Sequence, residues 1–328
     1  MSTAIDVDAA AGVVTLSRAD APAAEQVAAT LLAVAGELID DPSWIAEAAL
    51  RWHDLPESLR RPLLAYRRNS GRTGALLVRG LSVDESSLPE TPMVSGSAQR
   101  EATLPAALLM LVAAAFGDPI AFREEKSGAM VQNVVPVPGR EDVQGNEGSV
   151  LLTFHNENAF HEHRPDYVLL CCLRADHDRI AGLRTASIRQ VHGMLTEWHR
   201  EALFRKDFVT APPPSFGAAL GESEPHAVLS GALEDPDVMV DFAATKPLTE
   251  QAGDALVELQ SLFAANALTH YLTPGDLAIV DNRVTVHGRT GFAPRYDGRD
   301  RWLQRTTVTQ NLRRSRLLRA DDGHVLGG

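Results

Sequence analysis

The first third of the chain carries the spacing of apolar residues that predicts amphipathic helices. In residues 22–39 the apolar positions recur three or four apart, so that they fall on one helical face. These positions are Val27, Leu31, Val34 and Leu38. Residues 43–68 also look helical, and residues 105–116 are apolar nearly all round, which predicts a buried helix. Residues 75–79 are expected to form a strand. The helices before this strand are expected to form an N-terminal helical decoration of the domain at about 20–70.

Downstream of residue 116 the pattern changes to short runs of β-forming residues separated by turn signals. Two longer stretches, 190–205 and 249–265, look helical instead. The runs expected as strands are 129–135, 150–157, 167–173, 183–189, 226–230, 237–243, 276–281, 283–288 and 301–309. Such a series predicts a sandwich or barrel, and its irregular alternation with helices argues against a doubly wound parallel sheet. We expect a mainly β fold with flanking helices, in one domain over residues 1–328 with its core at about 120–310.

Two segments in this region lack any regular pattern. Residues 136–149 are rich in turn formers, and residues 208–224 contain the run Ala-Pro-Pro-Pro-Ser-Phe-Gly. Long loops inside a compact domain either serve a functional site or are surface excursions. The sequence leaves these two interpretations equally open, and we treat both segments as candidate walls of a pocket.

The composition is that of an ordinary globular protein. Of the 328 residues, 45% are hydrophobic and 23% charged, which excludes a disordered chain or a collagen-like repeat. A net charge of −12 argues against nucleic acid as a partner, because that affinity depends on cationic contacts to phosphate. The sequence shows no signal-peptide pattern and no apolar run long enough to span a membrane. Cys171 and Cys172 are adjacent and hard to bridge, so we expect buried thiols in the reducing cytoplasm.

The densest group of chemically active side chains lies in residues 154–163. If this run is a strand, His155 and Glu157 point to the same face, because side chains alternate along a strand. A His-x-Glu pair is common by chance, but His287 ends another β-like run far downstream. Two histidines and one carboxylate form the facial triad of non-haem Fe(II) oxygenases, which leaves coordination positions open.

A pair of arginines is the second chemical signal. Residues 301–308 look like a strand, and alternation places Arg301 and Arg305 on the same face. Inward guanidinium groups in a β core are costly unless they meet anions, and arginine favours bidentate contact with carboxylates. One arginine could hold 2-oxoglutarate and the other a substrate carboxylate, or both could pair with acids such as Asp281 or Asp300. The residues alone leave these alternatives about evenly balanced.

Several segments resemble the clavaminate synthase-like branch of the Fe(II)/2-oxoglutarate-dependent oxygenases. They are Val131-Gln132-Asn133-Val134-Val135-Pro136-Val137-Pro138, residues 155–174, Arg174-Ala175-Asp176 and residues 276–305, within a resemblance over roughly residues 70–316. The branch hydroxylates free amino acids. The resemblance therefore implies a double-stranded β-helix (jelly roll), with Fe(II) as the metal and 2-oxoglutarate and O2 as cosubstrates. Within the branch, the sequence is most similar to members that hydroxylate asparagine.

The resemblance also implies roles for individual residues. The positions that match iron ligands are His155, Glu157 and His287. Arg301 matches the arginine that binds the distal carboxylate of 2-oxoglutarate, and Arg305 the one that holds the substrate carboxylate. The positions that match contacts to the polar backbone end of the amino acid are Glu125 and Asn146, and Asp241 matches the acid that receives its side-chain amide. Segment 208–224 matches a lid. Halogenating relatives carry a small residue in place of Glu157, so halogenation is not expected.

The implied reaction is hydroxylation of Cβ of free L-asparagine, with succinate and CO2 as coproducts, to supply 3-hydroxyasparagine for nonribosomal peptide antibiotics. Asp241 should reject aspartate, whose carboxylate would meet a like charge. It would also accept the guanidinium of arginine or the ureido group of citrulline, so the same chemistry on these substrates stays open. Two further alternatives are a related oxidation such as desaturation, and a β-barrel module that binds an amino acid without turnover. No oligomeric state is predicted.

Some residues near these motifs have simpler interpretations. Arg289 is expected to support the site from behind or to pair with Asp281, and Trp302 is expected in the core. His161 and His163 share a face with His155 only if the strand continues, and the triad is complete without them.

Overall fold

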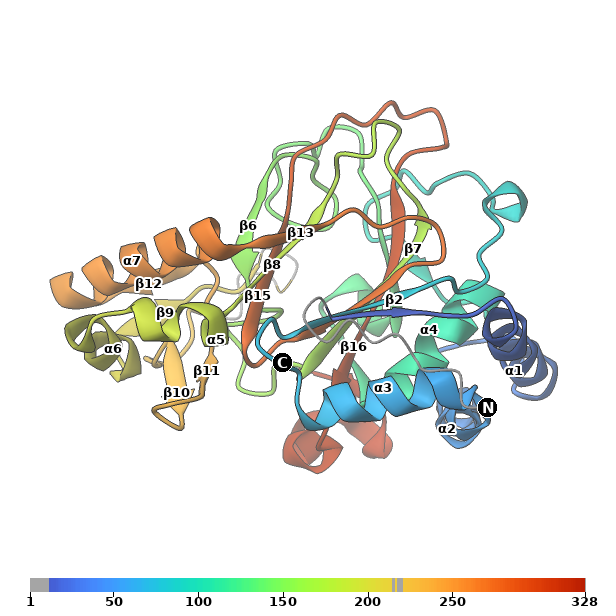
Figure 1. Cartoon of the computed structure of the whole chain (residues 1–328), viewed down its shortest axis with the longest axis horizontal. Helices are drawn as coiled ribbons and strands as arrows, with labels where there is room; N and C mark the ends of the chain where they lie inside the picture. Colours follow the sequence, from blue (N-terminus) through green and yellow to red (C-terminus); the bar gives the residue numbers. More distant parts are fainter. Residues whose placement is uncertain (1–11, 214–215, 217–220, 328) are drawn as a thin grey trace.

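The computed structural model describes residues 12–213, 216 and 221–327. The larger of its two main sheets (Figure 1) consists of β1 (Val13–Thr15), β2 (Ala75–Arg79), β3 (Ala98–Gln99), β4 (Asp118–Phe122), β5 (Val131–Val134), β7 (Tyr167–Arg174), β14 (Leu277–Asp281), β16 (Trp302–Thr309) and β17 (Val325–Leu326). Its order is β1-β2-β14-β7-β16-β4-β17, with β5 paired to β16 and β3 paired to β5. The long central strands β7 and β16 run antiparallel to each other.

The smaller main sheet faces the larger one and carries most of the residues with candidate chemistry. Its strands, in the order β13-β8-β15-β6, are β13 (Leu268–His270), β8 (Leu183–Ser187), β15 (Thr285–Arg289) and β6 (Leu152–His155). Beside it lie two short ribbons, β9 (Phe208–Thr210) with β12 (Thr245–Pro247), and β10 (Leu229–Gly231) with β11 (Pro236–Val238). Two facing sheets of this kind are the double-stranded β-helix (jelly roll) that the resemblance implies, and the fold prediction is confirmed.

Alternation along β7 shows how the two faces of the larger sheet are used. Leu169 and Cys171 pack outward into the cluster that contains the N-terminal helices. Leu170 and Cys172 point inward and pack with Leu183 of the smaller sheet. Both cysteines are buried and unbridged, as expected from their adjacency. A strand that is buried on both faces reads as a continuous apolar run, which is why residues 167–173 are so easily recognised.

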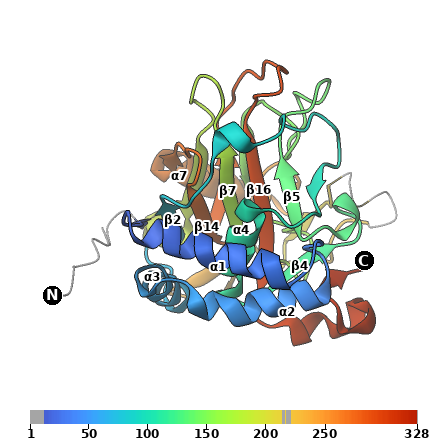
Figure 2. The same ribbon diagram turned by 90° about the vertical axis from the view of Figure 1, so that its right-hand side faces the viewer.

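Helices cover the outer faces of both sheets. The larger sheet is covered by α1 (Asp20–Val34), α2 (Pro42–Arg51), α3 (Glu57–Arg68) and α4 (Leu104–Ala114), of which α1 and α2 lie in front in Figure 2. α4 lies between these helices and the sheet, and its run from Ala106 to Ala113 is entirely buried, as its apolar sequence predicts. The smaller sheet is covered by α5 (Ile188–Val191), α6 (Glu197–Phe204) and α7 (Glu250–Asn266). The two helical groups thus lie on opposite sides of the molecule (Figure 1).

Several expected elements are shorter than the sequence pattern suggested. The helix expected over 22–39 ends at Val34, and the strand expected over 237–243 ends at Val238. The helix expected over 43–68 is two helices, because Leu55, which precedes Pro56, is extended after the 3-10 turn Trp52–Asp54 and Pro56 is the N-cap of α3. The helix expected over 190–205 breaks at a second 3-10 turn, His192–Met194. The strand expected over 150–157 ends at His155, and residues 157–160 form a turn in which Asn158 takes the left-handed conformation (φ 53°).

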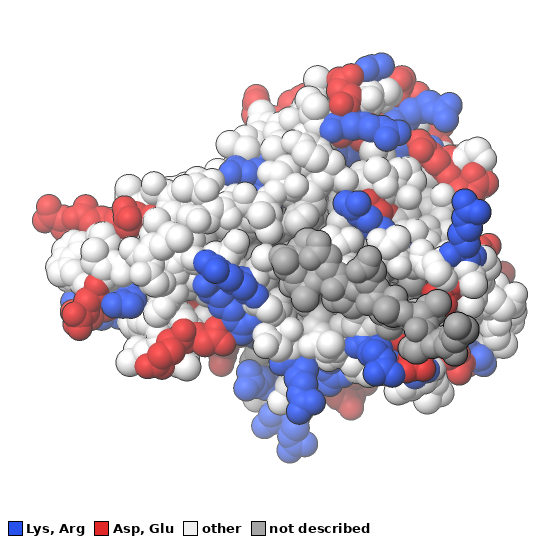
Figure 3. Space-filling view, viewed as in Figure 1, with Lys and Arg blue, Asp and Glu red and all other residues white. Residues whose placement is uncertain are grey.

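Charged side chains of both signs are interspersed over the face shown in Figure 3. Basic side chains gather at its lower edge (Figure 3). In the C-terminal segment, Arg313, Arg314 and Arg316 are exposed, whereas Arg319 is buried and ties the segment together by donating to the carbonyls of Leu312 and Gly323. Among the residues that the structure describes, no helix is long and apolar enough to cross a membrane.

Candidate active site

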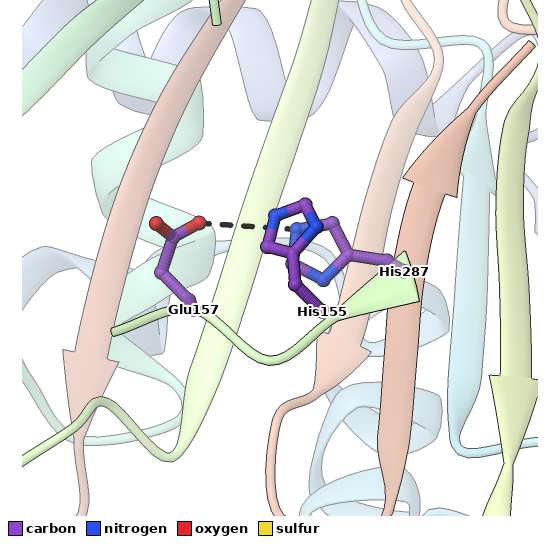
Figure 4. A group of neighbouring side chains, drawn as sticks. All are labelled: His155, Glu157 and His287. Atoms are coloured by element: carbon purple, nitrogen blue, oxygen red, sulfur yellow. Dashed lines mark ion pairs between the residues drawn. The ribbon is translucent and has the colours of Figure 1, made fainter. Parts of the chain in front are cut away.

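Three side chains that could bind a metal ion converge on the inner face of the smaller sheet. His155 is the last residue of β6 and lies directly opposite His287 of β15, with their ring centroids 4.4 Å apart. Glu157 follows in the turn after β6. The ligand atoms of all three lie within 4.8 Å of one another. Figure 4 shows the carboxylate pointing toward the histidines, and its Oε2 is 3.8 Å from Nε2 of His287.

Glu157 reaches this position through hydrogen bonds rather than through strand alternation. Because β6 ends at His155, the expectation that both residues lie on one strand is wrong. Asn282 holds the backbone of Glu157 from both sides: its Oδ1 accepts from the Glu157 N–H at 2.8 Å, and its Nδ2 donates to the Glu157 carbonyl at 3.1 Å. A buried side-chain amide therefore replaces the missing strand partner.

Asn156 completes this support between the two ligands. Its Nδ2 donates to the carbonyls of Asn282 and Thr285, each at 3.0 Å, and its Oδ1 accepts from the N–H of Val240. The two amides join three chain segments that are far apart in sequence. The sequence reasoning missed both residues, since a buried asparagine carries no pattern that separates it from a turn asparagine.

The charges of the three ligands suit a divalent metal. Burial, helped by the neighbouring His155, lowers the pKa of His287 to about 3, so its imidazole is neutral. His155 lies with Nδ1 2.9 Å from the carbonyl of Thr153, which leaves Nε2 for coordination when Nδ1 carries the proton. Burial opposes the charged form of Glu157, but Arg305 and the two histidines outweigh it and lower the pKa of its carboxyl. Two neutral imidazoles and one carboxylate fit Fe(II) in a facial triad.

A cavity of about 570 Å³ opens beside the triad. Glu125, Asn146, Asp241 and Arg305, the four positions expected to contact substrate, all line it together with His155 and Glu157. Residues 143–147 form part of its wall, as do Thr210, Ala211 and Pro213 from the second patternless segment. Most of the expected lid beyond Pro213, residues 214–215 and 217–220, lies outside the described residues. Lys126 also lines the cavity and was not expected there.

Arg305 is the charged centre of the cavity. Its Nη1 donates to Oε2 of Glu157 at 2.6 Å, and its Nη2 donates to Glu125 and to Gln132. Burial opposes its charge, but Glu125 and Glu157 raise its pKa overall. Arg305 therefore does not pair with Asp281 or Asp300, as one alternative had it, but with a candidate metal ligand. Gln132 belongs to the segment 131–138 that resembles the family, but its contact with Arg305 was not expected from the sequence.

Asp241 lies at the metal side of the cavity, where it forms an isolated β-bridge with His155. Its Oδ1 accepts from the N–H of Ala243 at 2.8 Å, while Oδ2 has no hydrogen-bond partner within the described part of the chain. Its own N–H donates to Oγ1 of Thr245 at 3.0 Å. From there a chain of hydroxyl contacts, each 2.8 Å long, runs through Thr210 to Nε2 of His226. One carboxylate oxygen of a rigidly held residue is thus left for a ligand.

Comparison with known proteins agrees with this geometry. Residues 238–307 match the model of the taurine catabolism dioxygenase TauD, TfdA family. The chain is 58% identical to L-asparagine oxygenase of Streptomyces coelicolor, over 96% of this chain and 94% of that protein. It is 33% identical to clavaminate synthase 2 of Streptomyces clavuligerus, over 85% of this chain and 88% of that protein. The chain belongs to the clavaminate synthase-like Fe(II)/2-oxoglutarate-dependent oxygenases.

Solved structures place this oxygenase in the same family. A crystal structure of asparagine oxygenase in complex with Fe(II), (2S,3S)-3-hydroxyasparagine and succinate superposes with a TM-score of 0.94 at 57% identity, over 97% of this chain and 99% of that chain. The non-haem iron oxygenase OrfP, in complex with Fe and α-ketoglutaric acid, superposes with a TM-score of 0.87 at 29% identity, over 96% of this chain and 100% of that chain.

Arg301, expected to bind the distal carboxylate of 2-oxoglutarate in this oxygenase, is not among the residues that line the cavity. It precedes β16 and is buried beside Arg289. The expected ion pair between Arg289 and Asp281 is wrong, because Asp281 instead accepts from Ser70 at 2.5 Å. Trp302, on the opposite face from Arg301, packs in the outer core as expected and donates Nε1–H to Asn133 at 2.8 Å.

Proposed function

We propose that this oxygenase hydroxylates Cβ of free L-asparagine with O2 and 2-oxoglutarate, and releases 3-hydroxyasparagine, succinate and CO2. The observation that carries the proposal is the position of Asp241. Asp241 has one unused carboxylate oxygen, and its backbone forms a β-bridge with that of the candidate metal ligand His155. Both residues line the cavity, so a side-chain amide bound to Asp241 would be held beside the metal. The identity of 58% to L-asparagine oxygenase supports the same substrate.

In this proposal, charged side chains bind both the backbone end and the side-chain end of asparagine. Arg305 binds the α-carboxylate, and Glu125, with Asn146, receives the α-ammonium group. Asp241 accepts an N–H of the side-chain amide through Oδ2. A site built for such a donor rejects an analogue that lacks it, because the bound analogue would cover the half-buried carboxylate of Asp241 and leave it unpaired. Aspartate is therefore a poor substrate, while arginine and citrulline also offer N–H groups and must be compared directly.

The residues of the chain act by positioning rather than by proton transfer. When bound, Fe(II) and 2-oxoglutarate supply the O2 activation that replaces a C–H hydrogen by hydroxyl. Arg305 and Asp241 hold the amino acid at both ends and thereby place Cβ, which lies between those ends, next to the triad. Effective molarity gained in this way is a main source of rate in enzymes of this kind. The walls around Thr210 and residues 143–147 exclude water from the bound substrate.

The test is turnover by the reconstituted enzyme. The protein is loaded anaerobically with Fe(II) and 2-oxoglutarate, air is added with single free amino acids, and products are measured by mass spectrometry. The expected product is asparagine with a gain of sixteen mass units, formed together with an equal amount of succinate. His155→Ala should not form this product. His53→Ala, a control change at an exposed histidine outside the cavity, should form it as the unaltered enzyme does. A product only from arginine or citrulline would overturn the substrate, and a loss of two mass units would indicate desaturation. No succinate with any amino acid would favour a binding module.

The cellular setting of the enzyme is also part of the proposal. The two buried, unbridged thiols Cys171 and Cys172 suit a reducing compartment, so we place the enzyme in the cytoplasm. Supply of 3-hydroxyasparagine to a nonribosomal peptide antibiotic stays a prediction. It would be tested by deleting the gene and searching for the loss of a hydroxyasparagine-containing peptide.

A further inference from the structure

Two buried guanidinium groups lie next to each other beyond the metal ligands. Arg289 is 4% exposed and Arg301 5%, and both lie over the ring of Phe292, at 5.1 Å and 5.9 Å from its centroid. Arg289 donates Nη2–H to the carbonyl of Val150 at 3.0 Å, but its buried Nε has no partner. Within the described residues, the Arg301 side chain makes no hydrogen bond and no ion pair.

The acids near this arginine pair are already committed to other groups. Asp300 accepts from the N–H groups of Arg295 at 2.7 Å and Tyr296 at 2.6 Å. Asp176 similarly accepts from the N–H groups of Ile180 and Ala181, at 2.9 Å and 3.0 Å. Neither carboxylate lies within ion-pair distance of Arg289 or Arg301, whereas most buried charges in proteins are paired.

The electrostatic cost of this arrangement follows from its geometry, because both guanidinium groups are buried and stack on the same ring without an ion-pair partner. Burial lowers the pKa of Arg301. Two adjacent cations without a counter-ion are destabilising, and a bound anion would relieve both at once.

The register of the smaller sheet places Arg289 at a defined distance from the metal ligands. Arg289 follows His287 by two residues in β15, so the two side chains share a face at about 6.6 Å along the strand. Both residues are paired with β8, His287 with Thr185 and Arg289 with Leu183. Between them, a Cβ on Gly288 would lie 2.5 Å from the carbonyl oxygen of Leu152, so β15 lies tightly against β6. This separation suits a five-carbon dicarboxylate whose keto-acid end is at the metal.

We propose that Arg289 is a second guanidinium for the distal carboxylate of 2-oxoglutarate, which it holds together with Arg301. The inference rests on the proposed function, in that 2-oxoglutarate is the cosubstrate. Arg289 offers the carboxylate its positive charge and a buried Nε–H that has no other partner. Arg301 offers its positive charge and guanidinium N–H groups that make no hydrogen bond within the described residues. The pair would select dicarboxylates over keto acids that end in a methyl group.

The test compares two keto acids on the same variants. Binding of 2-oxoglutarate and of 2-oxobutanoate, which lacks the distal carboxylate, is measured by calorimetry on protein loaded with redox-inert Mn(II), without amino acid. Arg289→Gln is expected to weaken 2-oxoglutarate roughly 10- to 100-fold, the effect of one charge-assisted contact, and to leave 2-oxobutanoate nearly unchanged. Arg184→Gln is the matched control, because Arg184 lies in the same sheet but stacks on Phe154 at 4.6 Å.

A purely structural role for Arg289 would weaken both keto acids together, and that result would overturn the proposal. Unchanged 2-oxoglutarate affinity in Arg289→Gln, or no 2-oxoglutarate binding by the unaltered protein, would overturn it as well. Arg289→Lys guards against a variant that does not fold, since it keeps the charge and should lose 2-oxoglutarate affinity only several-fold. Because no amino acid is present, a wild-type protein that binds 2-oxoglutarate but fails to hydroxylate asparagine would refute the proposed substrate alone.

Discussion

Binding of asparagine and binding of the metal should strengthen each other through Arg305. The oxygen of Glu157 that lies toward His287 is the same Oε2 that accepts from Arg305 at 2.6 Å. A metal ion bound to Oε2 competes with Arg305 for that oxygen, and a substrate carboxylate competes with Glu157 for Arg305. The ligand that binds first breaks the ion pair between Arg305 and Glu157. The ligand that binds second is therefore spared the free energy of breaking it. By reciprocity, each ligand raises the affinity for the other by the same factor.

The size of this coupling follows from the contact that both ligands break. The side chains of Arg305 and Glu157 are only 5% and 9% exposed, so their hydrogen bond is little screened by solvent. A hydrogen bond between charged groups contributes about 1.5–3 kcal/mol, which corresponds to roughly 10- to 150-fold in affinity. Arg305 also donates to Glu125 and Gln132, contacts that hold it near its position. We therefore expect a value near the lower end.

The assay is Mn(II) binding to the metal-free enzyme, by calorimetry or electron paramagnetic resonance, without 2-oxoglutarate. Saturating L-asparagine should tighten Mn(II) binding about 10-fold or more. The control ligand is 3-aminopropanamide, which is asparagine without its carboxylate and should leave Mn(II) affinity unchanged. Equal Mn(II) affinity with and without asparagine would refute the reasoning, and so would equal tightening by 3-aminopropanamide.

Three further predictions address the amide contact, the support of the ligands and the effect of pH. Asp241→Asn replaces a hydrogen-bond acceptor by a donor. The kcat/KM for asparagine should therefore fall about 10²-fold or more, while the kcat/KM for aspartate should rise. Competition between the two substrates, followed by mass spectrometry, checks this, and an unaltered preference would count against Asp241 as the amide acceptor. Asn282→Leu leaves the buried N–H and carbonyl of Glu157 unpaired, and should lower the free energy of unfolding of the metal-free protein by about 3 kcal/mol. If urea denaturation gives a loss of unfolding free energy below about 1 kcal/mol, the turn after β6 does not depend on Asn282 for its stability. Burial, with His163, lowers the pKa of His161 from 6.5 to about 4. Between these values only the unfolded chain takes up the proton, so stability falls as pH drops through that window. His161→Phe, which suits the neighbouring rings of Phe122 and Phe160, should flatten the decline between pH 7 and pH 5, and an equally steep decline would disprove the assignment.

The candidate metal ligands could be predicted from sequence because they occur in recognisable apolar surroundings. His287 lies in a buried strand, and His155 ends another, two residues before Glu157. The physical reason offered for Glu157 was nevertheless wrong, since the strand stops before it. Hydrogen bonds to Asn282, more than a hundred residues away, take over the role of strand pairing. Tertiary contacts of this kind leave no periodic signal in a single sequence.

Helix boundaries were harder to predict than helix positions. The apolar spacing over 43–68 continues across a 3-10 turn, because α2 and α3 pack on the same core. Only Pro56 marks the break. The environment of Arg289 could not be predicted from the sequence either. Asp281 is as plausible a partner as any by composition, and only tertiary packing brings Arg289 and Arg301 together over the ring of Phe292.

The two asparagines behind the metal ligands have a consequence for how such enzymes diverge. Asn156 and Asn282 secure the ligand-bearing turn through hydrogen bonds to backbone groups, not through the side chains that would recognise substrate. Glu125, Asn146 and Asp241 come from separate segments of the cavity wall. A side-chain substitution in the wall leaves these backbone hydrogen bonds of the ligand-bearing turn in place. The amino acid that fits the cavity can therefore change while the turn that carries Glu157 keeps its support.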